Sequence, residues 1–108
     1  MSNWTTICST DDLQPDSGIC ALVGDKQVAI FYMPKLEAIY AVDNWDPIGK
    51  ANVLSRGLIG DLKGEIVVAS PIHKQHFILN SGKCLEDETV QVQTYPVKVE
   101  NGIVQVQS

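Results

Sequence analysis

The chain has 108 residues, of which 44% are hydrophobic and 19% charged, and its formal net charge at neutral pH is −5. This length suits one hydrophobic core, so we expect a single domain spanning residues 1–108. The acidic balance argues against nucleic acid as a partner, because duplex binding depends on cationic side chains that contact phosphates. No apolar run reaches the roughly 20 residues needed to span a bilayer, and the first residues lack the pattern of a signal peptide. We therefore expect a cytoplasmic protein without a membrane partner.

Short apolar segments separated by turn-forming residues predict an all-β fold. We expect strands at residues 19–23, 27–32, 38–42, 65–69, 77–79, 90–100 and 103–107. Gly24-Asp25 is predicted to form the hairpin turn between the first two of these strands. One-turn helical segments are expected at 11–13 and 52–56, the latter with Asn52 as its N-cap and Gly57 as its terminator. The expected architecture is a small antiparallel β-sandwich or barrel.

The C-terminal hairpin can be predicted with its register. Asn101-Gly102 favours a type I′ turn, which requires positive φ at both central positions. This turn sets Glu100 opposite Ile103, and the same register pairs Val99 with Val104, Val97 with Val106 and Lys98 with Gln105. Pro96 has no N–H to donate to a ladder, so it is expected at an edge or a bulge of the long strand.

Two loops follow apolar strands and share a pattern. They are Asn44-Trp45-Asp46-Pro47-Ile48-Gly49 and Ser70-Pro71-Ile72-His73-Lys74-Gln75-His76-Phe77. Together they resemble the two cluster-binding loops of Rieske [2Fe–2S] domains, written Cys-x-His and Cys-x-x-His. Such a cluster needs two thiolates on one iron and two imidazoles on the other. The matching positions here are Asp46, Ile48, Ser70 and His73, so the resemblance implies a Rieske-like fold with both loops at one tip and no cluster.

Two other segments extend the resemblance and point to a narrower family. Residues 52–60 lie between the loops and residues 82–88 follow the second loop, and with the loops they resemble the small subunit of bacterial NADH-dependent assimilatory nitrite reductase. The resemblance implies a subunit without catalytic activity of its own. Its partner would be the large subunit, which carries FAD, sirohaem and an iron–sulfur cluster and reduces nitrite to ammonia. The chain itself would bind no cofactor or metal.

The cysteines leave an alternative function open. Cys8, Cys20 and Cys84 are widely spaced and form no Cys-x-x-Cys motif, which is typical of structural free thiols. An electron-transfer ferredoxin could draw an atypical ligand set from these cysteines and His73. A cluster-free β-domain adapter for another oxidoreductase is the third hypothesis.

The tip formed by the two loops is the candidate partner interface. Its candidate residues are Trp45, Ile48, Arg56, His73 and Lys74. Trp and Arg are enriched among the residues that dominate binding energy, but Trp45 and Ile48 could equally fill the space of the missing cluster, because interiors are close-packed. Rieske domains usually have glycine at the position of Lys74, so the resemblance implies that the tight cluster-wrapping geometry is no longer needed.

Zinc binding, acid–base catalysis and calcium binding are not favoured by the residues in and near the loops. His73 and His76 have a His-x-x-His spacing, but a zinc site would need two further ligands. Asp46 with His73 could form an acid–base couple, although a turn role for Asp46 and a buried hydrogen-bonding role for Ser70 are simpler. The acidic residues 86–88 predict a solvated loop rather than a calcium site. We therefore assign no catalytic residue.

Overall fold

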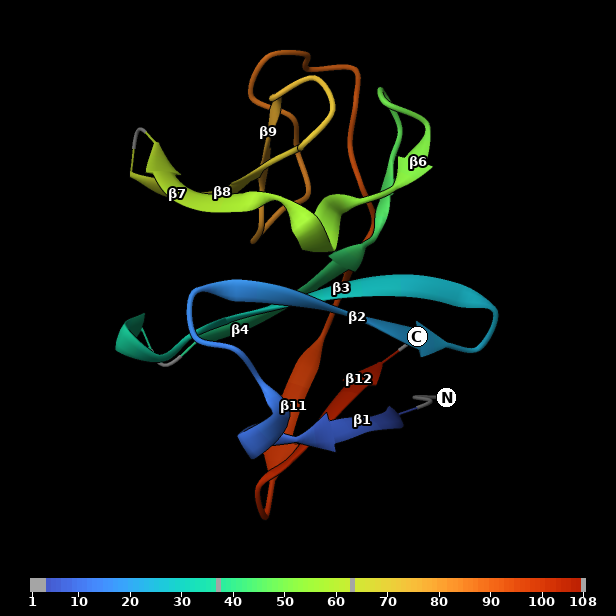
Figure 1. Ribbon diagram of the computed structural model, residues 1–108, viewed down its shortest axis with the longest axis vertical. Helices are drawn as coiled ribbons and strands as arrows, with labels where there is room; N and C mark the ends of the chain where they lie inside the picture. Colours follow the sequence, from blue (N-terminus) through green and yellow to red (C-terminus); the bar gives the residue numbers. More distant parts are fainter. Residues whose placement is uncertain (1–3, 37, 63, 108) are drawn as a thin grey trace.

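The computed structural model describes residues 4–36, 38–62 and 64–107, and these form an all-β fold (Figure 1). The strands are β1 (Trp4–Ser9), β2 (Ser17–Val23), β3 (Lys26–Met33), β4 (Ala38–Asp43), β5 (Trp45–Asp46), β6 (Ala51–Asn52), β7 (Leu58–Leu62), β8 (Glu65–Ala69), β9 (His76–Ile78), β10 (Thr94–Tyr95), β11 (Val97–Glu100) and β12 (Ile103–Gln107). One-turn 3-10 helices occur at η1 (Thr10–Asp12), η2 (Pro34–Leu36) and η3 (Leu54–Arg56). No helix within the described ranges is long and apolar enough to cross a membrane.

The strands form antiparallel sheets stacked in layers. The strand orders are β1-β12-β11, β10-β4-β3-β2, β5-β6 and β7-β8-β9. In Figure 1 the β2–β3–β4 sheet crosses the middle of the molecule, with β7, β8 and β9 above it and β1, β11 and β12 below. The predicted all-β antiparallel architecture is therefore confirmed.

The middle sheet is buried on both faces along most of β3, which explains the continuous apolar run at residues 28–33 of that strand. Ala29 and Phe31 belong to an upper cluster that also contains Leu54, Val68 and Phe77. On the other face of the same strand, Val28 and Ile30 join a lower cluster with Leu13, Ala41, Val104 and Val106. Successive side chains of a strand point to opposite faces, so a strand between two cores must be apolar at every position. The upper cluster is the core beneath the two loops.

Both predicted hairpins are confirmed. Val23 pairs with Lys26 across a two-residue turn in which Gly24 has φ +66°. Asn101 and Gly102 have φ values of +53° and +75°, the positive pair that a type I′ turn requires. The register of β11 and β12 is the predicted one, with Glu100 opposite Ile103 and Val97 opposite Val106.

The predicted strand at 90–100 is wrong as a continuous element. Thr94–Tyr95 pairs with β4, whereas Val97–Glu100 pairs with β12 in a different sheet. Pro96 stands between them and cannot donate to a ladder, so it marks the corner where the chain changes sheets. Residues 90–93 instead form a loop, in which the Val92 N–H donates to the Gly82 carbonyl at 2.8 Å.

Four strands and one cap differ from the sequence prediction. The two-residue strands β5 and β6 were not predicted, and β1 and β7 were missed because Thr5 and Thr6 in β1 and Gly60 and Asp61 in β7 interrupt the apolar pattern. The helical turn in 52–56 is η3, but its N-cap is Val53 without a side-chain hydrogen bond, so the predicted Asn52 cap is wrong. Gly57 ends this turn as predicted.

Candidate functional site

Asn44 folds the first loop back onto the central sheet. It is buried, and its carbonyl oxygen accepts hydrogen bonds from the Val53 N–H at 2.9 Å and the Leu54 N–H at 3.0 Å. Its side-chain oxygen accepts from the Ser55 N–H at 2.7 Å, and its side-chain amide donates to Gln27 Oε1 at 3.1 Å. A buried amide that uses both its donor and its acceptor fixes the groups around it. Asn44 therefore joins β4, the return segment of the loop and β3.

Asp46 is completely buried and organises the first loop from inside. Its Oδ1 accepts hydrogen bonds from the backbone N–H groups of Ile48 at 2.9 Å and Gly49 at 3.0 Å. The Lys50 N–H donates to the Asp46 carbonyl at 2.7 Å. Aspartate stabilises turns through contacts of this kind with the backbone that follows it. The predicted turn role of Asp46 is confirmed.

The same carboxyl group also connects the two loops. The Ser70 hydroxyl donates to Asp46 Oδ2, and the Gln75 amide donates to Oδ1 at 2.9 Å and to Oδ2 at 3.0 Å. Ser70 is completely buried and Gln75 nearly so. We call Asp46, Ser70 and Gln75 the inter-loop network. It confirms the buried hydrogen-bonding role predicted for Ser70, and it requires no cation, because amide and hydroxyl donors satisfy the carboxyl oxygens.

Apolar contact closes the space between the loops. A Cβ atom built on Gly49 would lie 2.7 Å from Ile72 Cδ1 and 2.8 Å from Asp46 Oδ2. Real Cβ atoms do not approach other atoms so closely, so only glycine fits between these two side chains. The first and second loops therefore pack directly on each other.

The turn of the second loop passes through Lys74, which stands where Rieske domains usually have glycine. Lys74 has φ +64°, a left-handed conformation that favours glycine. Its N–H donates to the Ser70 carbonyl at 3.0 Å, and the Ser70 N–H donates to the Gln75 carbonyl at 2.9 Å. The tight turn is therefore kept although its glycine is absent. Its hydrogen bonds offset the backbone strain of a non-glycine residue, which is about 1–2 kcal/mol.

The outer surface of the tip is apolar and basic. Trp45 is 45% exposed, and Arg56, His73 and Lys74 are also exposed. Ile48 is only half-exposed and packs against the upper cluster. The sequence left two roles open for Trp45 and Ile48, an anchor for a partner or a filler of the space between the loops. Ile48 fills space beneath the tip, whereas Trp45 faces outward.

The charge of the tip is opposite to that of the whole chain. Lys50, Arg56 and Lys74 lie in or beside the loops, and none forms a salt bridge within the described residues. Asp46 is the sole acidic residue in the sequence segments 44–58 and 70–76, and it is buried. The tip therefore presents unpaired positive charge on a protein of net charge −5, which favours an acidic partner surface.

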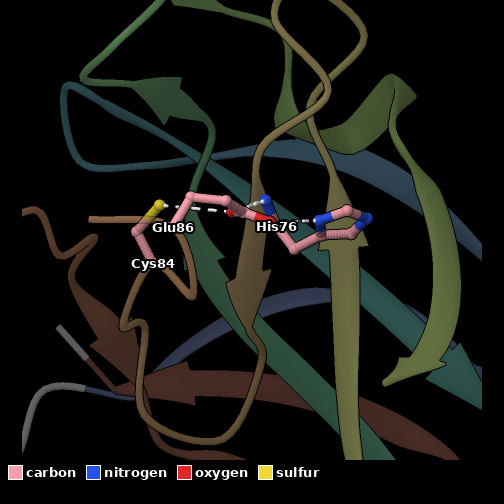
Figure 2. A network of polar contacts seen from close by, with 3 residues as sticks. All are labelled: His76, Cys84 and Glu86. Atoms are coloured by element: carbon pink, nitrogen blue, oxygen red, sulfur yellow. Dashed lines mark hydrogen bonds and ion pairs between the residues drawn. The ribbon is translucent and has the colours of Figure 1, made fainter. Parts of the chain in front are cut away.

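A second polar network ties the segment after β9 to the second loop, and Figure 2 shows it. Glu86 accepts hydrogen bonds from the His76 backbone N–H at 2.7 Å and contacts His76 Nδ1 at 2.7 Å. The Cys84 thiol is 3.7 Å from Glu86 Oε1. Partial burial raises the pKa of Glu86, but the hydrogen bonds and charge of His76 outweigh it, so the pKa lies below its ordinary value. Residues 86–88 are exposed and lie in a loop, as predicted, and Glu86 additionally bonds His76.

The residues at the tip do not fit a [2Fe–2S] cluster. The loops supply a carboxyl group, a hydroxyl group, an amide and one aligned imidazole, whereas the cluster needs two thiolates and two imidazoles. Cys8 lies on β1, Cys20 on β2 and Cys84 beside Phe77, so none belongs to the loops. Burial raises the pKa of each of these thiols, which disfavours the thiolate that iron requires. In the described part of the chain, no group of three or more His, Cys, Asp or Glu residues is placed to hold a metal.

Comparison with known proteins decides the family. Residues 3–107 match the model of the Rieske-like [2Fe-2S] domain. The chain is 48% identical over 106 residues to the nitrite reductase (NADH) small subunit of Escherichia coli strain K12, covering 98% of both chains. The chain belongs to the family of nitrite reductase small subunits with a Rieske-like fold. It also matches a putative NADH-dependent nitrite reductase small subunit from Mycobacterium tuberculosis with TM-score 0.94 and 43% identity, covering 100% of this chain and 96% of that one.

Other relatives place the same fold in different settings. A nitrite reductase [NAD(P)H] large subunit of Klebsiella oxytoca is 44% identical over 103 residues, which are 95% of this chain but 11% of that protein. A ferredoxin component of naphthalene 1,2-dioxygenase/salicylate 5-hydroxylase systems from Ralstonia is 31% identical over 100 residues, or 92% of this chain and 89% of that protein. The family therefore includes separate small chains and segments of much longer ones.

Sequence reasoning found most of the loop positions but missed two residues that hold them. Asn44 and Gln75 carry the contacts that join each loop to its surroundings, yet neither was singled out. A signal was available for Asn44, which is a polar residue directly after an apolar strand. None was available for Gln75, because its partner Asp46 lies 29 residues away.

Proposed function

We propose that this chain is the small subunit of a cytoplasmic NADH-dependent nitrite reductase, a non-catalytic partner of a larger chain that reduces nitrite to ammonia. The large chain carries the FAD, sirohaem and iron–sulfur cluster, and this chain contributes no cofactor of its own. The similarity over 98% of both chains to nitrite reductase (NADH) small subunits is the observation that carries the proposal. The misfit between the donors at the tip and a [2Fe–2S] cluster supports the absence of a redox role.

The relative from Klebsiella oxytoca supports physical association with a large chain. There the segment that matches 95% of this chain is 11% of a nitrite reductase [NAD(P)H] large subunit. A domain that is covalently joined to a larger protein in one relative lies beside it in space. The partner we propose for the separate chain is therefore the large nitrite reductase chain.

The surface that we propose for this association is the tip. Trp45 supplies an exposed aromatic anchor on the first loop, and Arg56, His73 and Lys74 add exposed positive or polar groups on the second loop and on the segment between the loops. Aromatic residues and arginine dominate the binding energy of many interfaces, and uncompensated charge adds steering and specificity. Ile48 supports the tip from beneath. The inter-loop network gives this surface a fixed shape before the partner binds, which lowers the entropic cost of association.

A second candidate function is electron transfer as a ferredoxin. The Ralstonia ferredoxin component favours it by its 31% identity, but the positions of Cys8, Cys20 and Cys84 oppose it, because they lie on separate elements away from His73. Iron and acid-labile sulfide analysis of anaerobically purified protein separates the two functions. A stoichiometric cluster would support the ferredoxin and contradict a cluster-free subunit. An adapter for another oxidoreductase would instead bind a different large partner.

The proposal is tested by NADH-dependent nitrite reduction by the purified large chain, with and without this protein. We expect added protein to raise the rate and to form a complex on gel filtration, and we expect Trp45→Ala and Arg56→Glu to weaken both effects. Leu22→Ala is the matched control, because Leu22 is an exposed apolar residue on β2 outside the tip. No complex and no gain in rate with wild-type protein would contradict the proposal.

A further inference from the structure

Strand β7 forms an open edge next to the tip. It is the outer strand of the β7–β8–β9 sheet (Figure 1), and its pairing runs along β8 from Leu58 with Ala69 to Leu62 with Glu65. Outside that ladder, no backbone hydrogen bond within the described ranges involves a residue of β7. An unpaired edge presents a row of N–H and C=O groups that another strand can use.

The register shows which backbone groups of β7 are free. The Ile66 carbonyl accepts from the Leu79 N–H and the Ser70 N–H donates to the Gln75 carbonyl, so the even-numbered positions of β8 point toward β9. Odd-numbered positions of β8 therefore point toward β7, where they meet Leu58, Gly60 and Leu62. It follows that the N–H and C=O groups of Ile59 and Asp61 point away from the sheet.

The outer face of β7 is apolar and hollow. Leu58 is 77% exposed and Leu62 38% exposed, and both share one face with Gly60, because side chains alternate along a strand. A Cβ atom built on Gly60 would meet nothing within 4 Å. The hollow over Gly60 is lined by these β7 residues together with Val67, Ala69 and His76. Exposed apolar positions flanking a hollow are typical of a site that receives side chains of a partner strand.

Positive charge stands at the start of the strand. Arg56 and Lys74 line a small cavity together with Leu58 and Pro71. Neither cation forms a salt bridge within the part of the chain that the structure describes. The tip is thus continuous with the β7 edge, and a carboxylate at this end of a bound segment would meet both cations.

We propose that β7 is a strand-addition site for an extended segment of the large nitrite reductase chain. The segment carries apolar side chains at alternate positions, which cover Leu58, the hollow at Gly60 and Leu62, and a carboxylate that pairs with Arg56 and Lys74. Its backbone pairs with Ile59 and Asp61, and main-chain hydrogen bonds of this kind supply affinity while the pockets supply specificity. This inference rests on the proposed function for the identity of the partner.

A second copy of this chain fits the edge less well. Antiparallel self-pairing centred on Gly60 would align the free backbone groups of the two copies. It would also set Asp61 of each copy opposite the half-buried Ile59 of the other, because the side chains of Ile59 and Asp61 lie on the same face of β7, the one that turns toward the upper cluster. Two chains of net charge −5 also repel each other. A segment of the large chain with apolar side chains at alternate positions and one carboxylate opposite Arg56 and Lys74 avoids both difficulties.

Amide hydrogen exchange in the assembled complex tests the proposal residue by residue. The complex of full-length chains is incubated in deuterated buffer, quenched and dissociated, and the small chain is read by NMR. We expect the Ile59 and Asp61 amides to exchange readily in the free protein and to slow by about tenfold or more in the complex. The Leu58, Gly60 and Leu62 amides, which face β8, are expected to be protected in both states.

A groove-filling variant gives a second, independent readout. Gly60→Val places a side chain in open space, so the free protein should keep its fold and its NMR spectrum, yet binding to the large chain should weaken by about tenfold or more. Leu58→Ser should weaken binding less. Leu22→Ser should leave binding unchanged, because Leu22 is a similarly exposed leucine on another edge strand.

The outcomes separate this inference from the proposed function. Strand addition is overturned if the complex forms without protection of the Ile59 and Asp61 amides and if the Gly60→Val chain binds the large chain as tightly as wild type. The proposed subunit function would then still stand. Failure of wild-type protein to bind the large chain overturns both. A dimer of the small chain that Gly60→Val dissociates would show that the edge receives a second copy, which also overturns the proposal.

Discussion

The two polar networks at the upper end of the molecule are built from similar groups but differ in environment. In the inter-loop network, the Asp46 carboxyl group is completely buried and bonds Ser70 and Gln75 from the other loop. In the second network, Glu86 bonds His76, and their side chains are 49% and 30% exposed. Water can replace a lost partner only in the second network. We therefore expect the buried network to determine the shape of the tip and the exposed network to have a smaller effect on it.

Asp46→Ala should produce the largest effect. It leaves the buried Ser70 hydroxyl and Gln75 amide and two partly buried backbone N–H groups without their acceptor, and each buried unsatisfied group costs about 1–3 kcal/mol. Relaxation and water entry reduce the sum, so we expect a loss of about 3–5 kcal/mol in the free energy of unfolding. Urea denaturation measures it. A loss below about 1 kcal/mol would show that the network does not hold the loops together.

Ser70→Ala should have an intermediate effect. It removes one hydroxyl donor to Asp46 but leaves the contacts from Gln75 and the backbone, so we expect a loss of about 1–2 kcal/mol by urea denaturation. Ser17→Ala is the control, because Ser17 is exposed on β2 and should change stability by less than about 0.5 kcal/mol. Equal effects of the two substitutions would contradict a stabilising role of the buried hydrogen bond between Ser70 and Asp46.

Glu86→Gln should have a small effect that depends on pH. Because the folded state lowers the pKa of Glu86 below its ordinary 4.5, the ionised form is the one that folding favours. Its contribution is fully present above about pH 4.5 and is lost as the pH falls through the lowered pKa. We expect a cost of about 0.5 kcal/mol at neutral pH, since the pair is partly exposed. The difference from wild type should vanish in acid; a difference that grows toward low pH would contradict this account.

Lys74→Gly should have the smallest effect, and it should stabilise the protein. Glycine relieves the left-handed backbone at this position, but it also gives the unfolded chain more freedom, so the net gain should be about 0.5 kcal/mol. Thermal unfolding measures this gain. A loss of stability would show that the Lys74 side chain makes a contact worth more than the backbone strain.

The parts of the fold that sequence predicts are those fixed by neighbours in the chain. The Asn101-Gly102 turn determines its own backbone, and the alternation around it sets Val97 opposite Val106. The break at Pro96 was anticipated as an edge or bulge, but the change of sheet was not, because the partner strand β4 lies more than 50 residues away in sequence. Local patterns cannot specify which sheet a short strand joins.

The site shows the same limit. The positions Asp46, Ile48, Ser70 and His73 followed from a resemblance, yet the structure joins Asp46 and Ser70 in one hydrogen bond while His73 stays exposed. Lys74 adopts a backbone conformation that favours glycine, because its N–H bonds the Ser70 carbonyl and because Ser70 and Gln75 both bond Asp46 of the other loop. Tertiary contacts decided each of these cases.

The most direct test of the account is the affinity of the Asp46→Asn chain for the large nitrite reductase chain, measured by titration calorimetry at a temperature where the variant is fully folded. Asp46 is completely buried and cannot touch a partner, and a neutral amide in place of its carboxyl group would not weaken binding to an acidic surface through charge, so weaker binding must act through the shape of the loops. Asn replaces one acceptor oxygen with a donor that faces Ser70 and Gln75, and we expect binding to weaken by about tenfold. Wild-type affinity in the folded variant would contradict the claim that the inter-loop network prepares the tip for docking.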